Sequence, residues 1–113
     1  MIPYANRRSP RELRHLKSLE PHARGHALLL LGIHPGLVVT SGRRTPLGNR
    51  RVGGSPTSWH LKGRAIDLDG PLPLLQAAAD TAWEQRLGHH CTGPEEVLIE
   101  RRGLTGEHLH VAW

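Results

Sequence analysis

Two polar clusters, each beside glycine residues, hold the residue types that hydrolytic chemistry requires. The first is SWHLKGRAID at residues 58–67, and the second is EHLH at residues 107–110. Together they offer His60, Asp67 and His110. Three nitrogen and oxygen ligands that leave a fourth position to water are typical of a catalytic zinc site. The two clusters therefore predict a metal centre with one Zn²⁺ per chain.

The spacing of these residues suits ligands that must meet at one point. Gly63 lies between His60 and Asp67 and lets the chain fold back, while His110 would arrive from a neighbouring strand. Zinc lowers the pKa of bound water to about 7, and an adjacent carboxylate can take the proton of that water as it attacks an amide carbonyl. Glu107 is the carboxylate that the second cluster supplies for this task.

Arg44 is a further chemical candidate, in a segment rich in arginine. Its planar guanidinium could polarise a substrate carbonyl or hold a substrate carboxylate through two hydrogen bonds, which Lys would do less well. The alternative is that Arg44 is one cation of a solvated basic loop with Arg43, Arg50 and Arg51. The sequence is compatible with both roles.

Hydrophobic periodicity and cap signals predict the elements that must position these residues. A helix begins at the Ser9-Pro10 capping box, and a second helix begins at Pro21 and ends at Gly32. The remaining elements expected are a strand at 37–41, a long binding or active-site loop at 42–58, a strand at 64–68, a helix at 72–86 and strands at 96–101 and 108–113. This order predicts an α+β fold, in which a small antiparallel sheet carries the metal site and is packed by the N-terminal helices and one inserted helix.

Strand alternation predicts which side chains share a face of the sheet. In the strand at 64–68, Asp67 lies on the face opposite Ile66 and Leu68, away from the core. In the last strand, alternation places His108 and His110 on one face and Glu107 on the other. A bend at the glycine of position 106 would resolve this conflict, because Glu107 would then precede the regular strand.

Length, charge and cysteine content limit the classes of protein to consider. The 113 residues predict one domain, and 15 Lys and Arg against 10 Asp and Glu give a net charge of +5, which favours an anionic partner. Cys91 is the only cysteine, which excludes an intramolecular disulfide, and we expect a structural role for His89, His90 and Cys91. The N-terminal residues lack the apolar stretch of a signal peptide, and the longest apolar run, at residues 27–31, is too short to span a bilayer.

The two clusters have the forms S-x-H-x-x-G-x-A-x-D and E-x-x-H overlapping H-x-H, and SGRRT at residues 41–45 precedes them. These motifs resemble those of the zinc D-alanyl-D-alanine carboxypeptidases and L-alanyl-D-glutamate endopeptidases, the LAS-type metallopeptidases that include phage endolysins and vancomycin-resistance dipeptidases. The resemblance covers residues 10–113 and implies the fold shared with the hedgehog domains. It implies that zinc is bound by His60, Asp67 and His110. The further roles it implies are Glu107 as general base, His108 as an aid to the transition state, and Arg44 and Ser58 as substrate contacts.

The function expected from these observations is zinc-dependent hydrolysis of peptidoglycan stem peptides, by an endopeptidase or a carboxypeptidase. We expect a phage-type endolysin made in the cytoplasm without a signal peptide, which acts on the cell wall after release. It would be a monomer of one peptidase domain, with no separate wall-binding domain, and its positive charge would favour the anionic cell envelope.

Two other classes remain as alternatives. A zinc-containing binding module could keep the fold without turnover, although the presence of both Glu107 and His108 argues against it. A basic metal-dependent nuclease is disfavoured because the chain has no nucleic-acid-binding motif and few aromatic residues.

Overall fold

The two N-terminal helices begin where the sequence supplies caps. In the computed structural model, which describes residues 8–88 and 94–113, helix α1 (Pro10–Ser18) has the expected capping box. The Ser9 hydroxyl accepts a hydrogen bond from Glu12 N at 3.2 Å, and the Glu12 carboxylate accepts one from Ser9 N at 3.1 Å. Helix α2 (Pro21–Ile33) runs one residue past Gly32, the expected end. The residues His89, His90 and Cys91 lie outside the described part of the chain.

Four strands form one antiparallel sheet, as expected. They are β1 (Val38–Ser41), β2 (Ala65–Asp69), β3 (Glu96–Glu100) and β4 (His108–Ala112), in the spatial order β1-β2-β4-β3. The central pair, β2 and β4, places Asp67 directly opposite His110. Two predicted ligands that are 43 residues apart in the sequence therefore become cross-strand neighbours.

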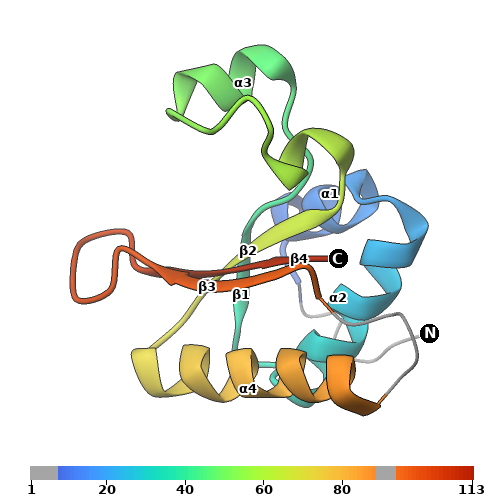
Figure 1. Cartoon of the computed structure of the whole chain (residues 1–113), viewed down its shortest axis with the longest axis vertical. Helices are drawn as coiled ribbons and strands as arrows, with labels where there is room; N and C mark the ends of the chain where they lie inside the picture. The colour runs from blue at the N-terminus through green and yellow to red at the C-terminus, as the bar shows by residue number, and fades with distance from the viewer. Residues whose placement is uncertain (1–7, 89–93) are drawn as a thin grey trace.

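One face of the sheet is apolar and is covered by helices. Helix α4 (Leu72–Gly88) runs along this face, and α2 lies beside it (Figure 1). Ile66 and Leu68 of β2 and Leu109 of β4 are completely buried in this layer. The inserted helix and the sheet thus enclose the core that hydrophobic periodicity predicted.

The other face of the sheet is polar and carries the site. Asp67 lies on it, as strand alternation predicted, together with His108 and His110. Asp67 is nevertheless buried, and the side chains of Arg44 and His60, from the segment that precedes β2, contact it.

The segment at residues 42–58 is more regular than predicted. Instead of one long loop, it contains helix α3 (Pro46–Arg51), whose N-cap Thr45 accepts a hydrogen bond from Gly48 N at 3.0 Å. A 3₁₀ turn, η2 (Trp59–Lys62), follows it and holds His60. Thr45-Pro46 is the same kind of helix start as Ser9-Pro10, but glycines and arginines around it obscured the signal. No helix in the described residues has the length and apolar character needed to cross a membrane.

Candidate metal centre

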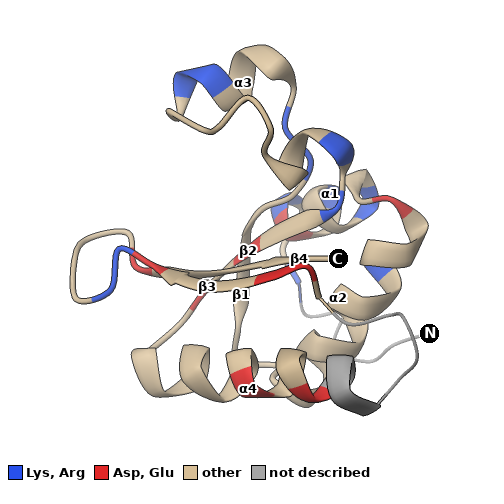
Figure 2. Cartoon of the chain, viewed as in Figure 1, with Lys and Arg blue, Asp and Glu red and all other residues tan. Residues whose placement is uncertain are grey.

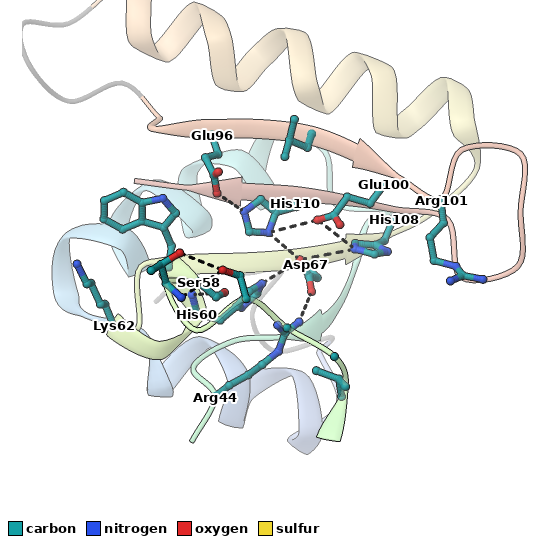
Figure 3. Close-up of a pocket in the computed structure, with 17 residues that line it drawn as sticks. Arg44, Ser58, His60, Lys62, Asp67, Glu96, Glu100, Arg101, His108 and His110 are labelled. Atoms are coloured by element: carbon teal, nitrogen blue, oxygen red, sulfur yellow. Dashed lines mark hydrogen bonds and ion pairs between the residues drawn. The ribbon is translucent and has the colours of Figure 1, made fainter. Parts of the chain in front are cut away.

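The three predicted ligands converge on the polar face of the sheet (Figure 3). Asp67 Oδ1 lies 3.1 Å from His60 Nε2 and 3.2 Å from His110 Nδ1. Zinc ligands at 2.0–2.2 Å from a tetrahedral ion are about 3.3–3.6 Å apart. The three side chains therefore fit around one ion with only a small adjustment, and they are the residues that would hold zinc.

A backbone turn brings His60 back to β2. Gly63 ends η2 with φ of 69°, in the left-handed region, so the expectation that the chain folds back at this glycine is confirmed. A Cβ atom at this position would also lie 3.2 Å from the backbone of Ser18 and Glu20. Any other residue there would strain the turn that places His60.

Hydrogen bonds to the outer ring nitrogens decide which nitrogen of each histidine faces the site. His60 Nδ1 lies 2.7 Å from the carbonyl oxygen of Gly42, which leaves Nε2 toward Asp67. His110 Nε2 lies 2.9 Å from Glu96 Oε1, which leaves Nδ1 toward Asp67. Such partners fix the tautomer and the orientation of metal-ligating histidines.

The charges around Asp67 keep it ionised. Burial alone would raise the pKa of Asp67, but hydrogen bonds from His110 and His60 and the charge of the imidazoles outweigh it and hold the pKa well below its usual value. For His110, burial acts to lower the pKa, but the bonds to Asp67 and Glu96 outweigh it and raise the pKa. An ionised carboxylate is the form of Asp67 that a metal ion requires.

Arg44 also contacts Asp67. Its Nη2 donates to Asp67 Oδ2 at 3.0 Å, and its Nη1 donates to Asn49 Oδ1 at 3.3 Å. Asn49 is buried in α3 and donates to the carbonyl of Ser55 at 2.8 Å, so α3 holds the guanidinium in place. A guanidinium has five N–H donors, so these two bonds leave capacity for a substrate oxygen.

Glu100 is a site residue that the sequence did not reveal. Its Oε1 lies 3.7 Å from His108 Nε2 and 3.8 Å from His110 Nδ1, and Glu100 is paired with His108 across β3 and β4. His108 itself lies 3.9 Å from Asp67 Oδ1. Only the register of β3 on β4 identifies Glu100, because Glu96 and Glu100 share the face of the histidines once the strands are paired.

Glu107 lies at the edge of this group. It precedes β4, and Gly106 has φ of 83°, so the expected bend is present. However, the Glu107 carboxylate accepts a hydrogen bond from Gly103 N at 2.7 Å, in the connection between β3 and β4. The structure therefore does not bring this carboxylate to the three ligands. Glu107 instead lines an adjoining space of about 600 Å³, here called the side cavity.

A family model described as peptidase M15 matches residues 29–91, more than half of the chain. The chain belongs to the peptidase M15 family. The match includes Arg44, His60 and Asp67, whereas His110 lies beyond it and is brought to the site by the pairing of β2 with β4. A search of curated proteins found no match.

The three predicted ligands of this M15 peptidase line a cleft of about 910 Å³, here called the main cleft. Ser58 lines it, and its hydroxyl accepts a hydrogen bond from His60 N at 3.2 Å, so this predicted substrate contact also caps η2. Lys62 and Arg101 contribute cations to the lining. Figure 2 shows further Lys and Arg residues on α3 and in the connection between β3 and β4.

Proposed function

We propose that this protein is a zinc peptidase that hydrolyses amide bonds in peptidoglycan stem peptides. The convergence of His60, Asp67 and His110 at separations of 3.1 and 3.2 Å, in an M15 chain, is the observation that carries the proposal. When bound, zinc supplies the polarisation that makes water a nucleophile at neutral pH. The cleft volume of about 910 Å³ is in the range that accommodates a ligand of several residues.

Three further residues of the site have proposed roles in substrate binding and transition-state stabilisation. Arg44 donates a hydrogen bond to Asp67 and, with its other N–H groups, stabilises the substrate carbonyl as negative charge develops on it. His108 Nε2 points into the main cleft beside Asp67 and Glu100, where it assists the transition state by hydrogen bonding. Ser58 contributes to the substrate-binding wall of the same cleft.

Two carboxylates are candidates for the general base. The E-x-x-H motif implies Glu107, whose carboxylate must leave Gly103 N and turn toward Asp67 before it can take a proton. Glu100 already lies within 3.8 Å of the metal-facing nitrogen of His110 and needs no such movement. Both remain candidates in this proposal, and matched variants of the two distinguish them.

The biological setting forms part of the proposal. The net charge of +5 and the cations around the cleft favour approach to an anionic cell envelope and to the carboxylates of stem peptides. We propose a monomeric, phage-type endolysin that is made in the cytoplasm and acts on the cell wall after release.

The decisive experiment is digestion of purified peptidoglycan by the zinc-loaded protein, with new termini identified by mass spectrometry. We expect new amino and carboxyl termini in the stem peptides. These should disappear with a chelator, return when zinc is restored, and be absent with His60→Ala. If peptidoglycan binds but no new termini form, the protein is a zinc-containing binding module, a role with which the hydrogen bond from Gly103 N to Glu107 is compatible.

A further inference from the structure

The main cleft does not end at the metal ligands. The side cavity, of about 600 Å³, shares four lining residues with the main cleft of about 910 Å³. The shared residues are Arg44, Val52, Asp67 and His108. The two spaces are therefore adjoining parts of one groove, and Asp67 lies at their junction.

We propose that a substrate peptide passes through both spaces, so that the enzyme is an endopeptidase that cuts inside a peptide chain. This inference rests on the proposed peptidase function. A carboxypeptidase needs room for only one residue beyond the bond it cuts, whereas the volume on either side of Asp67 here is that of a pocket for a larger ligand.

The charges in the groove support the same conclusion. A carboxypeptidase holds the terminal carboxylate of its substrate with a cation beyond the scissile bond, and Arg is the residue best suited to that task. Among the described residues that line the side cavity, Arg44 is the one cation. It lies at the junction and is bonded to Asp67, while Asp69 and Glu107 line the side cavity as well and would repel a terminal carboxylate.

The two ends of the groove differ in charge, which indicates the chemical class of the substrate. The main cleft contains Lys62 and Arg101 as well as Glu96 and Glu100. Because Glu96 and Glu100 lie against His110 and His108, the two cations are left for the part of a peptide that carries carboxylates. The side cavity contains Asp69 and Glu107 and suits a part that carries a free amine. The substrate is thus a peptide with an acidic residue on one side of the scissile bond and an amine-bearing residue on the other.

A pair of stem peptides that differ only at the C-terminus tests the endopeptidase assignment with the zinc-loaded protein. One peptide ends in a free carboxylate and the other in a carboxamide. We expect internal cleavage of both, with kcat/KM values within about threefold of each other. Loss of a charge-assisted hydrogen bond would slow cleavage of the carboxamide by about ten- to a hundredfold. Such a loss, with release of a single C-terminal residue, would overturn the inference.

The wall of the side cavity can be tested separately. Asp69→Asn keeps the acceptor that Asp69 Oδ1 offers to Gly70 N at 2.8 Å, but it removes the charge. We expect it to raise KM by about two- to fivefold for a stem peptide with a free amine, as expected for an exposed ion pair, and to leave KM unchanged when the amine is acetylated. Asp80→Asn, at an exposed site on α4, is the matched control and should leave KM unchanged for both the free-amine and the acetylated peptide. Identical KM values for Asp69→Asn and wild type on the free amine would contradict a substrate in this cavity.

Binding of the two purified product peptides provides a readout other than turnover. Added separately to the zinc-loaded protein, one product should shift the backbone NMR signals of Gly70 and Leu104 in the side cavity. The other should shift those of Gly54 and Ser58 in the main cleft. Shifts confined to one pair would overturn the inference while leaving the peptidase function intact. If no stem peptide is cleaved at all, the proposed function fails, and this inference fails with it.

Discussion

The imidazole of His110 is held between carboxylates on both of its nitrogens. Asp67 lies 3.2 Å from Nδ1, and Glu96 lies 2.9 Å from Nε2. Glu96 holds His110 Nε2, so Nδ1 is the nitrogen that His110 would offer to a metal ion. A residue such as Glu96, which contacts a predicted ligand and not the metal itself, should therefore affect the affinity for the metal.

Glu96→Ala should weaken zinc affinity by about ten- to a hundredfold, because His110 loses the partner that orients its ring. Glu96→Gln should lose less zinc affinity, since its amide oxygen can still accept a hydrogen bond from His110 Nε2. Competition with a chromophoric chelator measures both affinities. Glu95→Ala, at the exposed neighbouring position, is the control. Equal affinities for Glu96→Ala and wild type would exclude this role.

The general base can be identified by two isosteric variants. The residue that takes the proton should lose at least about a hundredfold in kcat when converted to the amide, because an amide cannot accept a proton from water. Glu107→Gln is expected to show this loss if its carboxylate turns from Gly103 N toward Asp67, and Glu100→Gln if it does not. Zinc content and melting temperature, unchanged in both variants, show that the site is intact. Loss of zinc from Glu100→Gln would instead identify Glu100 as a metal ligand.

Arg44→Lys should lower kcat/KM on a defined stem peptide by about ten- to a hundredfold, the equivalent of one charge-assisted hydrogen bond. An ammonium group is a point donor and cannot contact Asp67 and Asn49 while it also contacts a substrate. Arg50→Lys, exposed on α3, should have little effect. If both variants show equally small losses that vanish at high salt, the arginines act only as a diffuse positive surface.

At the scale of elements, α1 is tied to the edge of the sheet by one carboxylate. Glu12 accepts hydrogen bonds from Val39 N at 2.9 Å, Ser9 N at 3.1 Å and Arg8 Nη1 at 3.1 Å. Burial alone would raise the pKa of Glu12, but these bonds outweigh it and lower the pKa from its usual value of 4.5. The helix cap and the docking of β1 therefore depend on the ionised form of one residue.

The contribution of Glu12 to stability should depend on pH. Because its pKa is lower in the folded state, the ionised form stabilises the fold fully above pH 4.5, and this stabilisation is lost as the pH falls through the folded value. Glu12→Gln should lower the free energy of unfolding by about 1–2 kcal/mol at pH 7 and by much less at pH 3. Urea denaturation of the metal-free protein at both pH values measures this. Glu84→Gln, at an exposed position on α4, is the control substitution.

At the scale of the whole molecule, the three predicted ligands come from three separate elements. His60 comes from η2, Asp67 from β2 and His110 from β4. A bound ion would therefore link η2 to the two central strands of the sheet. Binding of an ion to the folded state alone raises stability in proportion to the logarithm of its concentration. Zinc should therefore act as a structural link as well as a catalytic group.

Zinc at about a thousand times its dissociation constant should stabilise the protein by about 4 kcal/mol over the metal-free form. Thermal unfolding with zinc and with a chelator measures the difference. His60→Ala should abolish most of it, because only two ligands remain. His22→Ala, which removes an exposed histidine on α2, should retain the full effect. Equal stabilisation of wild type and His60→Ala would mean that zinc binds elsewhere.

The amino-acid sequence alone predicted the candidate ligands, the turn at Gly63 and the elements of the α+β fold apart from α3 and η2. These features are local, because a cap, a left-handed glycine or an alternating strand is encoded within a few neighbouring residues. Only the tertiary structure decided how β3 pairs with β4, which puts Glu96 and Glu100 beside the histidines. It also decided that the Glu107 carboxylate bonds to Gly103 N. Strand register and side-chain direction depend on partners far along the chain or on competing hydrogen bonds, and residue spacing does not specify either.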